Sequence, residues 1–255
     1  MSTKIFKSKT ILAGLNAKTV KGDKGDQFVT AIMYLAPAAQ SLLGNVCPMA
    51  RLAGCEAGCL SKAGRAGIFS SIVNSRIAKT QRYFNSRSAF MAELVRDIAA
   101  FERWCVKHKV LPAVRLNGTS DIQWETAHPA DGFASIFDRF PGVQFYDYTK
   151  VYKRAYKALP ANYSLTLSYS EASPRYAEAV TKAAKETGRN LAVVFRTKEM
   201  RNQFTDRVAQ FGEFCSTVID GDETDMRFTD PKGCIVGLYA KGKGARRDTT
   251  GFVIG

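Results

Sequence analysis

Apolar runs alternate with amphipathic stretches along most of the chain. Residues 28–35 (FVTAIMYL) form a near-continuous apolar run, which is typical of a strand buried on both faces of a parallel sheet. Residues 69–109 repeat apolar side chains at three- and four-residue steps, and the polar stretch near Asn85 divides them into two expected helices. Further strands are expected at residues 111–116, 143–148, 164–169, 191–195, 217–219 and 234–239.

Helical patterns separate these runs. Helices are expected at residues 133–140, from about residue 151, at residues 174–186 and at residues 203–214. Repeated strand–helix alternation predicts an α/β fold with a mostly parallel sheet. Six such units suit a partial or complete β/α barrel, and an open doubly wound sheet is the alternative.

The size of the chain suits a single domain. It has 255 residues, of which 45% are hydrophobic, enough to bury a core. Within residues 1–255 we expect an N-terminal arm (1–26), a cysteine loop (45–67) and a basic C-terminal segment (240–255). No apolar run reaches the length of a membrane span, and the N-terminus lacks the apolar core of a signal peptide, so we expect a cytoplasmic protein.

Three cysteines share one Gly/Ala-rich stretch, and they carry the most informative chemistry. Cys47, Cys55 and Cys59 are spaced as C-x7-C-x3-C, with no histidine nearby. Structural zinc usually takes four Cys or His ligands in close pairs. A local set of three suits a [4Fe-4S] cluster with one iron left open. The sequence therefore predicts an iron–sulfur site at these three residues.

Two other interpretations of the cysteines remain open. Zinc is one, with a remote fourth ligand such as Cys215 or Cys234, and a group of buried, unligated thiols is the other. In a reducing cytoplasm the three cysteines outside the loop are expected to be free thiols. The two histidines have no ligand-like context, and no nucleophile elbow, P-loop or zinc-protease helix occurs.

The charge of the chain is strongly positive, at +14. The excess of basic over acidic residues favours polyanionic partners such as nucleic acid or phosphorylated small molecules. The basic run KGKGARR could follow a phosphate backbone, or it could be a flexible surface loop. Its candidate nucleic-acid contacts are Lys241, Lys243, Arg246 and Arg247.

Two further charged segments have less specific patterns. Residues 220–225 (DGDETD) offer hard oxygen ligands but match no full calcium loop. A solvated acidic turn is therefore the favoured interpretation, a carboxylate of the site the second and a metal site the third. Tyrosines and basic residues are interleaved over residues 146–163, which suits either base stacking or, more often, a helix with its aromatic side chains inward.

The order of elements resembles the radical S-adenosylmethionine superfamily over residues 28–220. Members of that superfamily place a three-cysteine loop after the first strand of a partial barrel of six β/α units, and their open iron binds S-adenosylmethionine. Their usual spacing is C-x3-C-x2-C, from which this chain departs. The resemblance implies S-adenosylmethionine contacts at Ser120, Asp121, Ser170, Glu171 and Arg196.

A closer resemblance is to an uncharacterised bacteriophage family, gene product eighty-eight. It is carried by the cysteine loop CPMARLAGCEAGCLSKAGRAG and by RLNGTSD, FYDYTK, DGDETDMRF and GLYAKGKGARRDTTGFVIG. These segments cover both ends and the middle of the chain. This resemblance implies a viral protein that works in the cytoplasm of a bacterial host.

Together these features predict a phage iron–sulfur protein. The favoured hypothesis is a radical S-adenosylmethionine-type enzyme acting on nucleic acid or a nucleotide. One alternative is a non-catalytic, cluster-containing protein that binds nucleic acid or a host factor. Another is a zinc-stabilised protein that binds or processes DNA.

Overall fold

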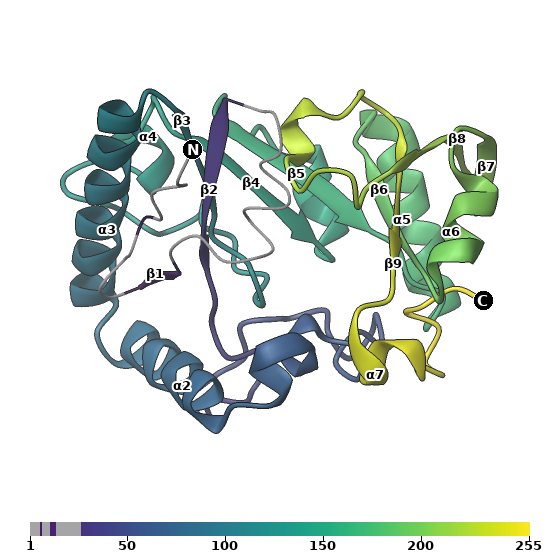
Figure 1. Ribbon diagram of the computed structural model, residues 1–255, viewed down its shortest axis with the longest axis horizontal. Helices are drawn as coiled ribbons and strands as arrows, with labels where there is room; N and C mark the ends of the chain where they lie inside the picture. Colours follow the sequence, from purple (N-terminus) through teal and green to yellow (C-terminus); the bar gives the residue numbers. More distant parts are fainter. Residues whose placement is uncertain (1–5, 7–10, 14–26) are drawn as a thin grey trace.

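A nine-stranded, mostly parallel sheet organises the protein (Figure 1). The computed structural model describes Phe6, residues 11–13 and residues 27–255, so most of the expected N-terminal arm lies outside the described residues. The strands are β1 (Leu12–Ala13), β2 (Phe28–Met33), β3 (Leu111–Arg115), β4 (Gln144–Thr149), β5 (Tyr163–Ser168), β6 (Leu191–Phe195), β7 (Val208–Phe211), β8 (Phe214–Asp220) and β9 (Ile235–Tyr239).

The strand order is β1-β2-β3-β4-β5-β6-β9-β8-β7. Strands β2 to β6, β9 and β8 pair in parallel, while β1 and β7 are antiparallel edges. No pairing among the described strands joins β1 to β7, so the sheet is open. The expected α/β class and parallel sheet are therefore confirmed. A closed barrel does not form among the described strands, because the edge strands β1 and β7 do not pair with each other.

Helices and short 3-10 turns connect the strands. The helices are α2 (Ser70–Asn85), α3 (Arg87–His108), α4 (Ile136–Arg139), α5 (Pro174–Thr187), α6 (Lys198–Phe204) and α7 (Gly242–Arg246). The 3-10 turns are η1 (Leu60–Lys62), η2 (Gly64–Gly67), η3 (Tyr152–Tyr156) and η4 (Arg227–Thr229). The two helices expected within residues 69–109 are confirmed, and they meet at Ser86.

Two expected helices are wrong. Residues 203–214 instead contain the end of α6 and the start of a β-hairpin, because Gly212 adopts a positive φ of 54° and lets β7 turn back onto β8. Phe211 and Phe214 are both buried beside this turn. The basic helix expected from residue 151 is only the short turn η3. There the chain is held by buried ionic contacts instead of by a helical apolar face.

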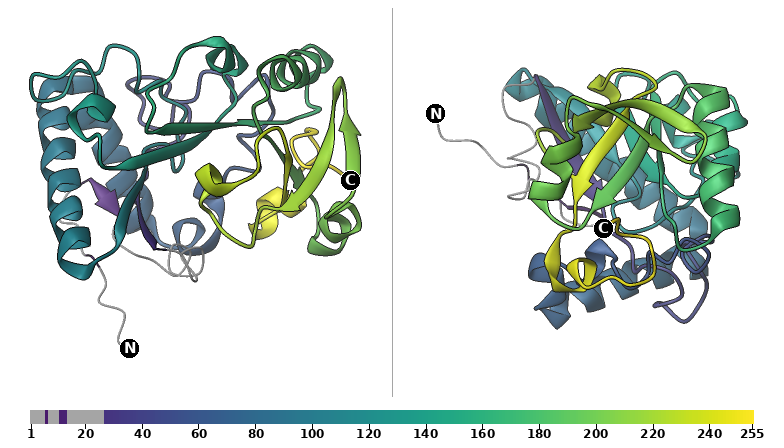
Figure 2. Two further views of the ribbon diagram at one scale, coloured as in Figure 1. Left: turned by 90° about the horizontal axis from the view of Figure 1, so that it is seen from above. Right: turned by 90° about the vertical axis from the view of Figure 1, so that its right-hand side faces the viewer.

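Two apolar clusters cover different parts of the sheet. One contains Leu94, Ile98 and Phe101 of α3 and packs on the β1–β4 part. The other contains Tyr176 and Val180 of α5 and packs on the β5–β9 part. Figure 2 shows these two helices at opposite ends of the molecule. The segment after β2, together with α2 and α7, crosses the carboxyl ends of the parallel strands, along the lower edge in Figure 1.

A buried ionic group lies beneath these strand ends. Arg154 of η3 is fully buried, and its guanidinium donates to both carboxylate oxygens of Glu125 at 2.9 and 2.8 Å. It also donates to Asp121 at 3.2 Å and to the Tyr163 hydroxyl at 2.8 Å. Removing one partner of such a buried ion pair strongly lowers the stability of the fold, because the remaining charge has neither water nor a partner.

Removing Arg154 therefore tests the contribution of this group. Arg154→Ala is expected to lower the free energy of unfolding by about 3–5 kcal/mol, as measured by urea denaturation. The control is Lys185→Ala, which removes an ion pair to Glu213 whose two side chains are about half exposed. That substitution is expected to lower the free energy of unfolding by less than about 1 kcal/mol. Equal losses in the two variants would contradict the assigned role of Arg154.

Candidate functional site

The cysteine loop lies across the carboxyl edge of the sheet and is fixed by hydrogen bonds to its carbonyl groups. The Val46 carbonyl accepts from the backbone N–H of Asp121 at 2.8 Å. The Ala53 carbonyl accepts from the Ser170 hydroxyl at 2.7 Å, and the Gly54 carbonyl from the Thr250 hydroxyl at 2.9 Å. The donors follow β3, β5 and β9, so three distant segments determine the shape of this loop.

The C-terminal segment packs directly against the loop. A Cβ atom placed on Gly58 would lie 3.0 Å from the Phe252 ring, and one on Gly244 would lie 3.3 Å from the Ala57 carbonyl. Glycine at these positions permits the close approach of α7 and the chain end to the cysteine loop. The segment then returns to the sheet, where Ile254 pairs with Phe195.

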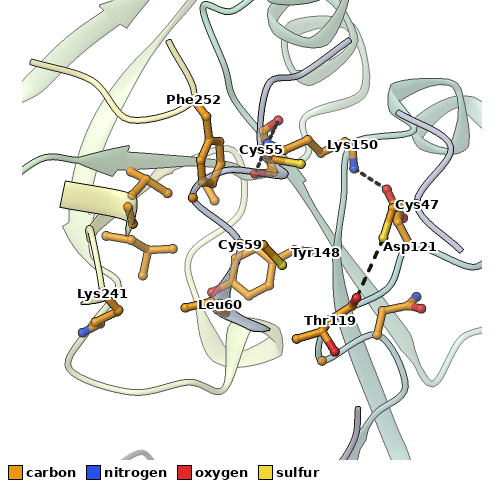
Figure 3. A pocket seen from close by; sticks show the side chains of 18 of the residues that line it. Cys47, Cys55, Cys59, Leu60, Thr119, Asp121, Tyr148, Lys150, Lys241 and Phe252 are labelled. Atoms are coloured by element: carbon orange, nitrogen blue, oxygen red, sulfur yellow. Dashed lines mark hydrogen bonds between the residues drawn. The ribbon is translucent and has the colours of Figure 1, made fainter. Parts of the chain in front are cut away.

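A cavity of about 220 Å³ lies between the cysteine loop, the strand ends and the C-terminal segment (Figure 3). Cys47, Cys55 and Cys59 all line it. Its other walls include apolar side chains of β6 and β9 and polar residues that follow β3 and β4. The three cysteines, which are not adjacent in sequence, thus line one common space.

The surroundings of Cys47 and Cys55 disfavour the ionised form of these two thiols. The pKa of Cys47 is raised to about 12, chiefly by burial and also by the nearby Asp121, Cys59 and Cys55. Burial also raises the pKa of Cys55, although the positive charge of Lys150 opposes this shift. Bound metal supplies the positive charge that reverses such shifts and deprotonates coordinating thiols. Among the described residues, no three Cys, His, Asp or Glu side chains are grouped so as to hold a single metal ion.

Two of the predicted S-adenosylmethionine contacts line the cavity. Ser120 donates to the side-chain oxygen of Asn117 at 2.9 Å. The Asp121 carboxylate accepts from the Thr149 hydroxyl at 2.7 Å, the Lys150 backbone N–H at 2.8 Å and Arg154. Burial raises the pKa of Asp121, and Arg154 opposes this shift. Asp121 therefore supports the wall of the cavity through protein contacts.

The other three predicted contacts lie outside the residues that line the cavity. Ser170 holds the Ala53 carbonyl, as described above, and the Glu171 side chain is exposed and accepts from the Tyr169 hydroxyl. The Arg196 guanidinium donates to the carbonyls of Arg246 and Asp248 at 3.0 and 2.9 Å. Ser170 and Arg196 thus fix the cysteine loop and the C-terminal segment.

The predicted nucleic-acid residues divide into two groups. Lys241 lines the cavity, with its ammonium 2.5 Å from an Asp222 oxygen and 3.6 Å from the centre of the Tyr239 ring. Lys243, Arg246 and Arg247 are exposed on α7 and just after it. These three residues leave a basic surface beside the cysteine loop.

The acidic turn at residues 220–225 is not the solvated turn expected from the sequence. Asp222 and Asp225 line the cavity, and Asp220 forms an ion pair with the buried Arg201. The turn thus contributes carboxylates to the site, an arrangement that the sequence favours less than a solvated turn.

Arg115 and Lys150 also line the cavity, and neither is among the site residues predicted from the sequence. Lys150 is buried, donates to the Ser168 hydroxyl at 2.8 Å and lies 4.5 Å from the centre of the Phe252 ring. Burial lowers its pKa to about 8, while Cys55 and Asp121 oppose this shift. Both residues are charged and stand at the end of an apolar run, in LPAVR and in QFYDYTK. A charge at the carboxyl end of a buried strand was the available signal.

Comparison with known proteins identifies the family. A family model described as Gene product 88 matches residues 7–255. The chain belongs to the Gene product 88 family. The resemblance to this family expected from the sequence is therefore confirmed. No curated protein and no solved structure matches the chain, and the likeness to the radical S-adenosylmethionine superfamily receives no support from these comparisons. Of the helices described, none has the length and apolar character needed to cross a membrane.

Ser170→Ala tests how the cysteine loop of this Gene product 88 protein is held. The substitution leaves the buried Ala53 carbonyl without its donor, so a loss of about 1–3 kcal/mol in the free energy of unfolding is expected. Ser164→Ala is the matched control, because Ser164 lies on the same segment in a partly exposed position of β5. Urea unfolding that gives the same stability for both variants would contradict the proposed anchor.

Proposed function

We propose that this protein holds a [4Fe-4S] cluster through Cys47, Cys55 and Cys59. The observation that carries the proposal is that all three thiols of the loop line one cavity at the carboxyl edge of the sheet. Among the described residues, the lining includes no histidine and no fourth cysteine. Three thiolates bind three irons and leave one iron of such a cluster open to another ligand.

The donor set suits a cluster better than a single zinc ion. Zinc holds sulfur ligands at about 2.3 Å, so its thiolates must converge closely on one point. The described residues contain no such group of three ligands. A cluster contains four metal atoms, and its thiolates therefore lie farther apart around a larger centre. The cavity that the three cysteines line is consistent with this arrangement.

Residues around the three cysteines provide apolar surface and a positive charge for the proposed cluster. When bound, a cluster of this kind supplies single electrons, and its open iron takes a donor atom from a small molecule. Phe252 and Leu60 contribute apolar surface to the walls of the cavity. The buried ammonium of Lys150 offsets part of the negative charge of the thiolates, since its charge lowers the pKa of Cys55.

We propose further that the activity is of the radical S-adenosylmethionine type. In support, β2 to β6 are parallel neighbours in sequence order, and the cysteine loop follows β2, the first of them. Of the predicted cofactor contacts, Ser120 and Asp121 remain as cavity residues. The basic surface on α7 favours a nucleic acid or a nucleotide as the substrate, in the cytoplasm of a bacterial host.

The second candidate function is a non-catalytic protein with a structural cluster. It is favoured by the position of Lys243, Arg246 and Arg247, which are exposed beside the cysteine loop and are not among the residues that line the cavity. Such a protein would bind nucleic acid or a host factor across this surface.

Cysteine variants test the cluster directly. Protein purified anaerobically is expected to be brown and to contain about four irons and four sulfides per chain. Cys47→Ala, Cys55→Ala and Cys59→Ala are each expected to lose most of this iron. Cys215→Ala is the matched control, because Cys215 is exposed on β8, and it should retain the iron. Stoichiometric zinc, or iron unaffected by the three loop substitutions, would contradict the proposal.

A separate assay tests the activity. Under dithionite and S-adenosylmethionine, the wild-type protein is expected to release 5′-deoxyadenosine, measured by liquid chromatography. Cys59→Ala should abolish the release, because the cluster is lost, while Cys215→Ala should not change it. An intact, reducible cluster with no release would overturn the enzymatic proposal and favour the binding protein.

A further inference from the structure

The cavity has a second polar wall that the cluster proposal does not use. Arg115 is the last residue of β3, is 6% exposed and lines the same space as the three cysteines. Its guanidinium lies over the ring of Tyr148, 4.8 Å from the ring centre. Tyr148 also lines the cavity, and Figure 3 shows it between the cysteine loop and the strand ends.

The Arg115 guanidinium lacks the hydrogen bonds that a buried charge requires. Its Nε is buried and has no hydrogen-bond partner among the described residues. The carboxylate paired with it, Asp147, is 4.0 Å away, which is beyond hydrogen-bond distance. By contrast, the equally buried Arg154 donates to two carboxylates and a hydroxyl. Buried polar groups are almost always paired, so a cavity-lining guanidinium with an unpaired nitrogen is a candidate contact for a ligand.

Neighbouring groups keep Arg115 charged, but no described group forms a hydrogen bond with its Nε. Burial lowers its pKa, but Tyr148, Asp225 and Asp147 together raise it above the usual value. The Asp147 carboxylate is already used, since it accepts from the Asn117 backbone N–H at 2.7 Å and from the Tyr163 hydroxyl at 3.1 Å. A bound anion would therefore gain a charged donor group whose Nε has no hydrogen-bond partner among the described residues.

The rest of the cavity indicates what kind of anion fits. The walls of the cavity also include the apolar side chains of Leu60, Val194 and Leu238, and they carry the carboxylates of Asp222, which is paired with Lys241, and Asp225. The apolar side chains favour an apolar or aromatic body over a bare inorganic ion. We propose that Arg115 binds the carboxylate or phosphate of a small organic anion whose body occupies the cavity beside the cysteines. This deepens the proposed function by giving a substrate class, and it rests on that function only in placing the ligand beside a cluster.

Charged and neutral probes of one shape test the proposal without any substitution. Titration calorimetry of the full-chain protein would compare benzoate and phenyl phosphate with neutral benzamide, and with inorganic phosphate. At least one of the two organic anions is expected to bind ten times more tightly than benzamide or inorganic phosphate. The better of the two identifies the group as carboxylate or phosphate. Equal binding of benzamide and both organic anions would overturn the proposal, as would inorganic phosphate binding as tightly as they do.

Substitution assigns the selectivity to Arg115. Arg115→Gln is expected to remove the tenfold preference for the anion, and Arg115→Lys to retain part of it because the charge is kept. Arg139→Gln is the control, because Arg139 of α4 is paired with Asp131 and does not line the cavity. Unchanged selectivity in folded Arg115→Gln would overturn the assignment.

The two proposals fail in different ways. Anion selectivity in a protein that binds no iron would leave this inference standing and would reject the cluster. An iron-loaded protein without anion selectivity would reject this inference and leave the cluster standing.

Discussion

Asp121 joins the cysteine loop to the sheet, and the cavity depends on this connection. Its backbone N–H holds the Val46 carbonyl, next to Cys47, while its carboxylate holds the backbone of Lys150 and the guanidinium of Arg154. Arg154 in turn binds Glu125 and Tyr163. A loop with little regular structure is thereby tied to a fully buried ionic group, whose partners cannot separate without leaving charges unpaired.

The C-terminal segment completes the site from the opposite side. Thr250 binds the cysteine loop, Phe252 covers Gly58 and Lys150, and Arg196 binds carbonyls of the same segment. A part of the chain that appears from its composition to be a basic tail is thus a wall of the cavity. This is why one space is lined by thiols, by a guanidinium whose Nε has no hydrogen bond among the described residues, and by apolar side chains from distant parts of the sequence.

The sequence predicts the parts of this protein that depend on local patterns. The buried strand at residues 28–35, the two helices within 69–109 and the parallel sheet follow from apolar periodicity. The insertion of β9 between β6 and β8 and the β7–β8 hairpin depend on long-range pairing and on the backbone of Gly212, which periodicity does not report. The site shows the same division. The three cysteines could be identified from their spacing, whereas the cavity positions of Arg115 and Lys150, and the anchoring role of Ser170, arise from tertiary contacts.

The central claim is that three thiols of this Gene product 88 protein surround an iron–sulfur cluster at the carboxyl edge of an open parallel sheet. An anaerobic crystal structure with anomalous data collected at the iron absorption edge tests it most directly. The account predicts a compact group of iron atoms bonded to the sulfurs of Cys47, Cys55 and Cys59, with one iron facing the cavity. A single metal ion, or three thiols with no metal between them in protein isolated without oxygen, would contradict it.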